Sequence, residues 1–214
     1  MGTVRRPIVI VGCGGHGREI FGIISAVNHA EGDPWKVVGF LDDAPTESNL
    51  GRLDRLGVAW LGPGASLAQL DAHYVIGIGD PRVRAVVAAE LDPLGRPAAR
   101  LVHPAATVGL DNDLADGVVV FAGARITTNV SLGRHVHVNQ NATVGHDSVL
   151  AEFVQVNPVA AVSGDCRIGR EVLIGTSASV LQGRAVGDRS TVGAGACVVR
   201  DVSPDKIVKG VPAA

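Results

Sequence analysis

The sequence predicts a small α/β domain over residues 1–101, followed by a parallel β-helix over residues 102–214. Three observations lead to this prediction. Strand-like and helix-like segments alternate up to Leu101, whereas an aliphatic residue recurs every six positions from Val102 onward. The chain of 214 residues also contains 28 glycines and only 3% aromatic residues, a composition that suits thin uniform layers joined by tight turns.

Buried strands and amphipathic helices alternate along the first half, as is typical of a small parallel sheet covered by helices. The predicted strands are residues 8–12 (IVIVG), 36–43 (KVVGFLDD) and 73–80 (HYVIGIGD), and the predicted helices are residues 17–30 and 82–94. The glycine-rich residues 51–66 are predicted to form a loop with one further short strand over residues 58–61.

From Val102 the period of the pattern changes to six. Consecutive positions at this spacing are aliphatic without interruption: Val102, Val108, Leu114, Val120, Ile126, Leu132, Val138, Val144, Leu150, Val156, Val162, Ile168, Ile174, Val180, Val186, Val192 and Val198. Neither an α-helix, with a period of 3.6, nor an ordinary strand, with a period of 2, produces this spacing. A hexad repeat is typical of a β-helix in which three hexads complete a triangular coil, so residues 18 positions apart are expected to stack.

A glycine-rich sextet follows the first predicted strand: residues 12–17 read GCGGHG, which fits the pattern G-x-G-x-x-G. Such glycines let the backbone approach a phosphate, and the helix that follows offers N–H groups to an anion. Two carboxylates end the second predicted strand, where they can accept from a guanine base or hold a ribose diol. We therefore predict a nucleotide site formed by Gly12, Gly14, Gly15, His16, Asp42 and Asp43, in which His16 either contacts the ligand or caps the turn.

The sequence GHD within the repeat supplies a candidate catalytic group. His146 lies two positions after Val144, where the hexad turns toward solvent, and its neighbours one coil away are the small residues Thr128 and Gly164. An imidazole with a pKa near neutrality can accept the proton that an attacking amine or hydroxyl gives up. Asp147 follows directly and can hold the other ring nitrogen, as the carboxylate of a catalytic triad does.

Other function classes fit less well. An NAD-dependent oxidoreductase would use the glycine motif, but the α/β part has about half the length of a full dinucleotide fold, and nothing in the repeat resembles a hydride-transfer site. A zinc enzyme needs converging ligands, and His135, His137 and His146 are not spaced to stack, so no metal site is predicted. A non-catalytic solenoid leaves the pair His146–Asp147 without a role.

Composition narrows the class of partner and the compartment. The net charge is −2 and there is no basic run, which argues against a nucleic-acid partner. The apolar runs are too short to span a bilayer and no secretory signal pattern is found, so no membrane partner and a cytoplasmic location are predicted. The cysteines are odd in number and lack metal-ligand spacing, which predicts reduced thiols at Cys13, Cys166 and Cys197.

The whole chain resembles the sialic-acid and bacillosamine-type sugar acyltransferases. The resemblance rests on the α/β part headed by GCGGHG, on hexapeptide repeats that contain VGHDSVL (144–150) and on the tail KGVPA (209–213). It implies a Rossmann-like N-terminal domain, a left-handed β-helix, acetyl-CoA as cosubstrate and a homotrimer with active sites between subunits. Within the family, the resemblance is closest to N-acetyltransferases of nucleotide-linked 4-amino-4,6-dideoxysugars such as GDP-perosamine.

The resemblance also implies roles for single residues. His146 takes the position of the family's base, and the backbone N–H of Gly164 is expected to bind the thioester oxygen. Asn139 matches an asparagine near the acceptor sugar, although it also fits an internal amide ladder with Asn157. Gln155 stands where the family often has a histidine near acetyl-CoA, which concentrates the proton chemistry on His146. The residues expected to contact the coenzyme are Gln155, Gly164, Gly175, Thr176, Gly193, Ala194 and Lys209.

We therefore predict an acetyl-CoA-dependent N-acetyltransferase. Its acceptor is the 4-amino group of a GDP- or UDP-linked 4-amino-4,6-dideoxysugar, and its pathway is bacterial surface polysaccharide or glycan synthesis. The alternative is an O-acetyltransferase that acts on sialic acid or a related sugar.

Overall fold

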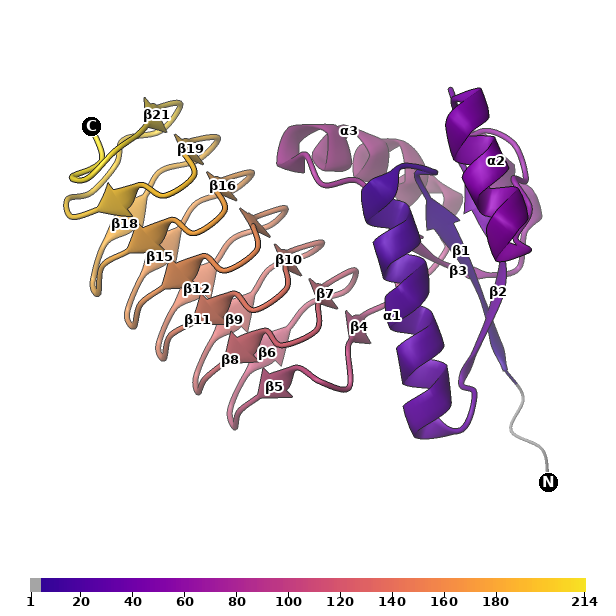
Figure 1. The fold of residues 1–214 in the computed structure, drawn as a ribbon, viewed down its shortest axis with the longest axis horizontal. Helices are drawn as coiled ribbons and strands as arrows, with labels where there is room; N and C mark the ends of the chain where they lie inside the picture. The colour runs from indigo at the N-terminus through magenta and orange to yellow at the C-terminus, as the bar shows by residue number, and fades with distance from the viewer. Residues whose placement is uncertain (1–4) are drawn as a thin grey trace.

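A computed structural model describes residues 5–214 and shows an α/β domain beside a long parallel β-helix (Figure 1). The three strands of the α/β domain form a parallel sheet in the order β2-β1-β3. Its elements, in chain order, are β1 (Arg6–Val11), α1 (Gly15–Glu31), β2 (Trp35–Leu41), α2 (Glu47–Leu56), η1 (Gly64–Gln69), β3 (His73–Ile76), α3 (Pro81–Leu91) and η2 (Asp92–Leu94). The predicted fold class is confirmed.

Helix α2 differs from the sequence prediction, which places a loop over the glycine-rich residues 51–66. Thr46 caps this helix by accepting from the Asn49 N–H at 3.2 Å, and Gly57 ends it in the left-handed conformation with φ 67°. Leu53 is the buried residue of the helix. The helix carries leucines at every third position, Leu50, Leu53 and Leu56, so its apolar spacing and its capping residues were both available signals.

Two predicted strands are shorter than expected. The strand expected over residues 58–61 is reduced to a single parallel bridge between Phe40 and Trp60, and Gly62 then turns the chain with φ 110°. The strand expected over residues 73–80 ends at Ile76. Asp80, at its predicted end, instead caps α3 by accepting from the N–H groups of Arg82 and Val83.

The β-helix confirms the hexad repeat. Its two-residue strands are β4 (Leu101–Val102), β5 (Thr107–Val108), β6 (Asp113–Leu114), β7 (Val119–Val120), β8 (Arg125–Ile126), β9 (Ser131–Leu132), β10 (His137–Val138), β11 (Thr143–Val144), β12 (Val149–Leu150), β13 (Gln155–Val156), β14 (Ala161–Val162), β15 (Arg167–Ile168), β16 (Leu173–Ile174), β17 (Ser179–Val180), β18 (Ala185–Val186), β19 (Thr191–Val192), β20 (Cys197–Val198) and β21 (Ile207–Val208). Paired residues lie 18 positions apart, as Val138 and Val156 do.

These strands form three faces of a prism. Face 1 contains β4, β7, β10, β13, β16, β19 and β21; face 2 contains β5, β8, β11, β14, β17 and β20; face 3 contains β6, β9, β12, β15 and β18. We call the edges between them the 1–2 edge, the 2–3 edge and the 3–1 edge. The aliphatic anchors fill the interior, where Val138, Val144 and Val156 have no exposed surface.

Most hexads turn through a residue in the left-handed conformation, three positions after the anchor. Asn129, Asn141 and Asp147 are examples, with φ of 54°, 57° and 61°. Asn, Asp and Gly tolerate this conformation best among the residue types, although Phe153 and Val159 also adopt it here. The side chain of such a residue lies at an edge of the prism, so the edges collect polar groups.

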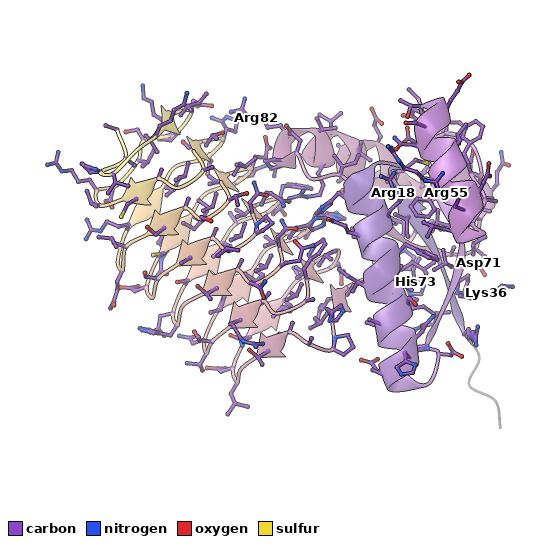
Figure 2. All side chains as sticks on the ribbon, in the orientation of Figure 1. Arg18, Lys36, Arg55, Asp71, His73 and Arg82 are labelled. Atoms are coloured by element: carbon purple, nitrogen blue, oxygen red, sulfur yellow. The ribbon has the colours of Figure 1, made fainter. Side chains whose placement is uncertain are left out.

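The α/β domain packs on face 1 of the β-helix. Phe121 and Val119 from the β-helix share an apolar cluster with Ile20 and Ile24 of α1. Arg82 of α3 reaches the later coils, where its guanidinium donates to the Arg189 carbonyl at 2.5 Å (Figure 2). The domains are therefore joined both by apolar packing and by polar contacts.

Arg84 of α3 is the largest fully buried side chain at this junction. Its guanidinium donates to the carbonyl oxygens of His135 at 3.0 Å and Phe153 at 2.8 Å, and to Gln155 Oε1 at 2.9 Å. Further donors reach the carbonyls of Ile78 and Val154. Burial lowers the pKa of Arg84 to about 9, so the group stays charged at neutral pH and is solvated by backbone and amide dipoles.

The last coil ends in a folded-back segment, residues 209–214. Thr191 of β19 pairs with Ile207, two positions earlier than the 18-residue spacing. Lys209 and Ala214 then exchange backbone hydrogen bonds at 3.1 Å, and the Ala213 N–H donates to the Cys197 carbonyl of β20 at 2.8 Å. Across residues 5–214, no helix is long and apolar enough to cross a membrane.

Candidate active site

The glycine-rich loop and the ends of the three parallel strands line a cavity of about 790 Å³. Glycine is required at two positions of this loop. Gly12 has φ 111° and a Cβ there would lie 2.9 Å from the Gly77 carbonyl oxygen, and a Cβ on Gly17 would lie 2.0 Å from the Gly12 carbonyl oxygen. The structure brings together all the residues predicted for the nucleotide: Gly12, Gly14, Gly15, His16, Asp42 and Asp43.

The two predicted carboxylates are partly used in holding loops. Asp42 accepts from the Cys13 N–H at 2.7 Å and from the Ala44 N–H at 3.0 Å. Asp43 Oδ1 accepts from the Gly64 N–H at 2.8 Å. Helix α1 begins at the loop after Gly14, and no described side chain caps it, so its first N–H groups remain available to an anion.

His16 contacts the β-helix, a relationship that the sequence did not suggest. Its Nε2 lies 2.9 Å from Nδ1 of His137 in β10, and the two rings stack with centroids 5.1 Å apart. Burial lowers the pKa of His16 to about 4 and the pKa of His137 well below its usual value. Both rings are therefore neutral at pH 7.

The environment of this pair favours one tautomer. Nε2 of His137 is buried without a partner among residues 5–214. A buried N–H without an acceptor is rarer and more costly than an unfilled lone pair, so the proton belongs on His137 Nδ1, which donates to His16. His16 then carries its proton on Nδ1, which lies 3.5 Å from Glu19 Oε2. In this arrangement His16 offers a hydrogen-bond donor at the mouth of the cavity.

The buried histidine pair is expected to make the fold less stable in mild acid. The unfolded chain binds a proton at each histidine near pH 6.5, whereas the folded chain does so only at lower pH. The free energy of unfolding therefore falls as the pH decreases from 6.5 toward 4. The His137→Gln variant should lose about 2 kcal/mol less stability than the wild type between pH 7 and pH 5, measured by urea unfolding.

The matched control for this measurement is His29→Gln, at an exposed histidine near the end of α1. This control should lose as much stability in acid as the wild type. Equal losses in His137→Gln and the wild type would contradict the assignment of a buried neutral histidine.

A second cavity of about 350 Å³ continues from His16 along the 1–2 edge. It is lined by the carboxylates of Glu19 and Asp80 and by the amides of Asn139, Gln140, Gln155 and Asn157. Asn139 is 3% exposed and donates through Nδ2 to the Val156 carbonyl at 3.1 Å, not to Asn157 as an amide ladder would require. Gln155 accepts from Arg84 and donates to Asn157 Oδ1 at 3.1 Å, so it supports the domain junction.

The candidate base lies on the 2–3 edge. His146 Nδ1 is 2.6 Å from Asp147 Oδ2, which matches the expected pairing, and about half of each side chain is exposed. Gly164 stacks on the ring: a Cβ there would lie 2.5 Å from His146 Nε2. The Gly164 N–H donates to no acceptor among residues 5–214. The structure therefore brings together His146, Asp147 and Gly164.

One residue of this cluster was missed. Asn129 Nδ2 donates to Asp147 Oδ1 at 2.7 Å, so both carboxylate oxygens are held. The pKa of Asp147 is lowered by the hydrogen bonds from His146 and Asn129. Asn129 stands 18 positions before Asp147. Because residues at this spacing stack in the β-helix, the contact could have been predicted from the sequence.

The predicted site residues form two separate groups in one chain. Gly175 and Thr176 follow β16, Gly193 and Ala194 follow β19, and Lys209 follows β21, so these residues stack along the 1–2 edge together with Asn139. The cluster of His146, Asp147 and Gly164 lies on the 2–3 edge. Since face 2 separates these edges, a single chain does not bring the candidate base to the cavity beside the glycine-rich loop.

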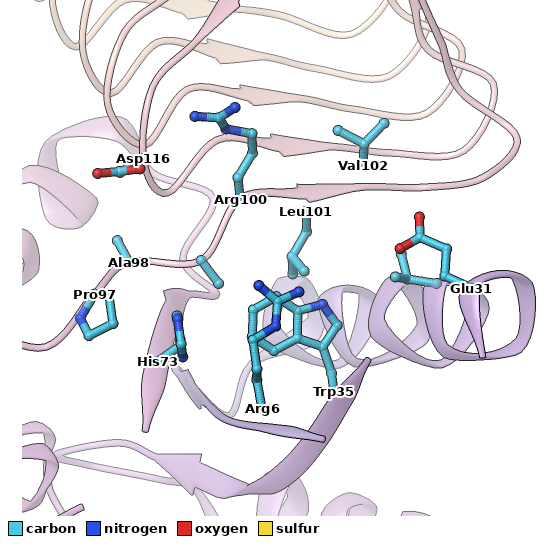
Figure 3. Close-up of a pocket in the computed structure, with 12 residues that line it drawn as sticks. Arg6, Glu31, Trp35, His73, Pro97, Ala98, Arg100, Leu101, Val102 and Asp116 are labelled. Carbon is cyan, nitrogen blue, oxygen red and sulfur yellow. The ribbon is translucent and has the colours of Figure 1, made fainter. Parts of the chain in front are cut away.

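A third cavity, of about 450 Å³, lies at the opposite ends of the parallel strands (Figure 3). Arg6 stacks on Trp35, with its guanidinium carbon 3.9 Å from a ring centroid, and His73 lies beside them. The lining contains none of the predicted site residues. Among residues 5–214, no group of three His, Cys, Asp or Glu side chains is arranged to hold a metal ion.

The chain is similar to known proteins over almost its whole length. The family model for the PglD N-terminal domain matches residues 7–91. A perosamine N-acetyltransferase from Caulobacter crescentus, solved as a mutant with CoA and GDP-perosamine, is 30% identical with a TM-score of 0.86, covering 97% of this chain and 95% of that one. The acetyltransferase domain of PglB from Neisseria gonorrhoeae, solved with acetyl coenzyme A, is 32% identical with a TM-score of 0.86, covering 98% of both chains.

WeeI from Acinetobacter baumannii, at 22% identity and a TM-score of 0.82, shares the fold. No curated protein matches the chain. The Caulobacter and Neisseria matches span nearly the full length of both chains, so they include the α/β domain and the β-helix together. The chain is therefore an acyltransferase and belongs to the hexapeptide-repeat family of sialic-acid and bacillosamine-type sugar acyltransferases.

Proposed function

We propose that the chain transfers an acetyl group from acetyl-CoA to the 4-amino group of a GDP- or UDP-linked 4-amino-4,6-dideoxysugar such as GDP-perosamine. The main support for this proposal is that one chain contains both the cavity beside the glycine-rich loop and the cluster of His146, Asp147 and Gly164. Two proteins of the same architecture, at 30% and 32% identity, were solved with CoA or acetyl-CoA. The product serves cytoplasmic synthesis of a bacterial surface polysaccharide or glycan.

The chemistry follows from the geometry of the 2–3 edge. The acceptor amine attacks the thioester carbonyl carbon, and His146 Nε2 accepts the proton that the nitrogen loses. Asp147 holds the Nδ1 proton of the ring and stabilises the imidazolium that forms. The free N–H of Gly164 binds the oxyanion of the tetrahedral intermediate, which collapses to the amide as the CoA thiolate leaves and takes up a proton.

The separation of the two edges supports a homotrimer with active sites between subunits. The nucleotide cavity of one chain opens toward its own 1–2 edge, whereas His146 lies on the 2–3 edge. A neighbouring copy that presents its 2–3 edge completes the site and encloses the pantetheine arm of acetyl-CoA between two β-helices. Binding energy from the distant nucleotide then positions the reacting amine.

The charge of the second cavity favours an amino sugar over sialic acid. Glu19 and Asp80 place two carboxylates beside the amides of the 1–2 edge. The nearby cation, Arg84, already donates from all three guanidinium nitrogens to other protein groups. An ammonium group is attracted to such a cavity, whereas the carboxylate of sialic acid is repelled.

The test is a panel of acceptors. Incubation with acetyl-CoA and UDP-, GDP- or dTDP-linked 4-amino sugars should release free thiol with at least one member, and mass spectrometry should find one added acetyl group on nitrogen. Removal of the nucleotide by hydrolysis should reduce kcat/KM, because the cavity in the α/β domain is then empty. Turnover with free sialic acid and with none of the amino sugars would replace this proposal by O-acetylation.

A further inference from the structure

The carboxylate of Asp147 is fixed at both oxygens by side chains from two different coils. Its Oδ2 lies 2.6 Å from His146 Nδ1, and its Oδ1 accepts from Asn129 Nδ2 at 2.7 Å. Both Asn129 and Asp147 have left-handed backbone, and their main chains are tied by hydrogen bonds to the coil below, from the Asn129 N–H to Leu110 and from the Asp147 N–H to Thr128. The backbone on both sides of the contact therefore holds Asn129 Nδ2 in position to donate to Asp147.

We infer that Asn129 is a positioning residue for the acetyl transfer: it orients the Asp147 carboxylate that in turn holds the His146 ring. This inference rests on the proposed role of His146 as the base. An exposed carboxylate otherwise rotates freely and exchanges its partner for water, which loosens the imidazole. A second donor on the opposite oxygen fixes the plane of the carboxylate and so the direction in which His146 Nε2 points.

The left-handed turn at position 129 does not by itself require an asparagine. Asp111, Asp147, Asp165 and Asp205 occupy left-handed turn positions of the same kind, so an aspartate fits the backbone at position 129 equally well. What an aspartate cannot do is donate to a neighbouring carboxylate. Asn129 is therefore the residue type that the contact with Asp147 needs, because it supplies a donor and adds no charge beside the imidazole.

Few other charged groups face the His146–Asp147 pair. Arg167 of β15 donates to the Asp147 carbonyl at 2.8 Å. Asp165, in the next coil, donates its N–H to the His146 carbonyl, and its carboxylate lies 3.6 Å from Arg167. Asp111 lies one coil below Asn129. These groups are exposed and screened, so a new charge at position 129 acts chiefly on Asp147 and His146.

The discriminating variant is Asn129→Asp, which has the same shape but replaces the donor with a second carboxylate. The added negative charge favours the imidazolium, so the pKa of His146 should rise by about half a unit. It should be measured by proton–nitrogen NMR titration of the full-length, substrate-free protein. With an acceptor sugar, the acidic limb of the kcat/KM profile should move upward by the same amount, and kcat should fall about tenfold.

Two further variants separate positioning from general damage. Asn129→Ala removes the donor without adding charge, so kcat should fall several-fold with little change in KM. Gln69→Glu adds the same charge at an exposed position of η1 in the α/β domain, and it should leave the His146 titration unchanged. An unchanged His146 titration in folded Asn129→Asp would overturn the inference, whether or not an acceptor sugar has been found. If the wild type acetylated none of the nucleotide-linked amino sugars, that result would instead contradict the proposed function.

Discussion

Replacing His146 with alanine is expected to lower kcat by about 10²- to 10⁴-fold, because a positioned base contributes this much to proton transfer. The fold should remain intact, since the ring is half-exposed and anchors no apolar cluster. The affinity for the sugar nucleotide should also persist, because the cavity proposed to bind the nucleotide lies in the α/β domain. Initial rates of thiol release and calorimetric titration with the acceptor measure these two quantities.

Mixing two inactive variants tests whether the active site lies between subunits. A Cβ on Gly14 meets nothing within 4 Å, so Gly14→Trp should fold while filling the nucleotide cavity. When Gly14→Trp and His146→Ala chains are reassembled in equal amounts, about one quarter of the interfaces combine an intact cavity with an intact base. Activity near that fraction of the wild-type value is expected. Mixed assemblies without activity would show that each chain completes its own site.

Replacing Arg84 with methionine is expected to lower the free energy of unfolding by about 2–5 kcal/mol. The carbonyl oxygens of His135 and Phe153 accept from no other donor among residues 5–214, so the variant leaves both buried and unsatisfied. Methionine fills the space and restores apolar contacts, but it supplies no donor. Urea unfolding at neutral pH, followed by circular dichroism and by fluorescence of the buried Trp35, measures the loss.

Arg82→Met is the control from the same helix. Arg82 is exposed and makes one contact to the β-helix, so its loss should cost less than about 1 kcal/mol. Arg84→Lys keeps the charge with fewer donors and should fall between the two. If Arg84→Met were as stable as Arg82→Met, the buried guanidinium would not be what joins the domains.

The β-helix and the cluster around His146 could be predicted because the repeat converts sequence spacing into contact. A period of six fixes which residues point inward, and three periods fix which residues stack, so Gly164 could be placed against His146 without coordinates. The same rule reaches Asn129, 18 positions before Asp147, although a turn residue of common type does not draw attention by itself. The nucleotide loop was predictable for a different reason, because glycines at fixed spacing reflect a backbone constraint.

The contacts across the domain junction could not be predicted. His137 occupies an outward-facing position of its hexad, and Arg84 lies in a helix where a charge normally marks the solvated side. Both are buried because the α/β domain covers face 1, and nothing in the hexad pattern distinguishes the face that will be covered. The partnership of His16 with His137, 121 positions apart, depends on that choice of face.

The folded-back segment at residues 209–214 has a consequence for how the chain behaves in concentrated solution. A β-helix ends in an unsatisfied row of strand N–H and C=O groups, which is a template for another solenoid to stack upon end to end. The hydrogen bond from Ala213 to the Cys197 carbonyl occupies part of this row, and the shortened last coil bends the chain across it. At the other end, α1 lies against β4. Each end of the coil stack is thus partly covered, which hinders two solenoids from stacking end to end.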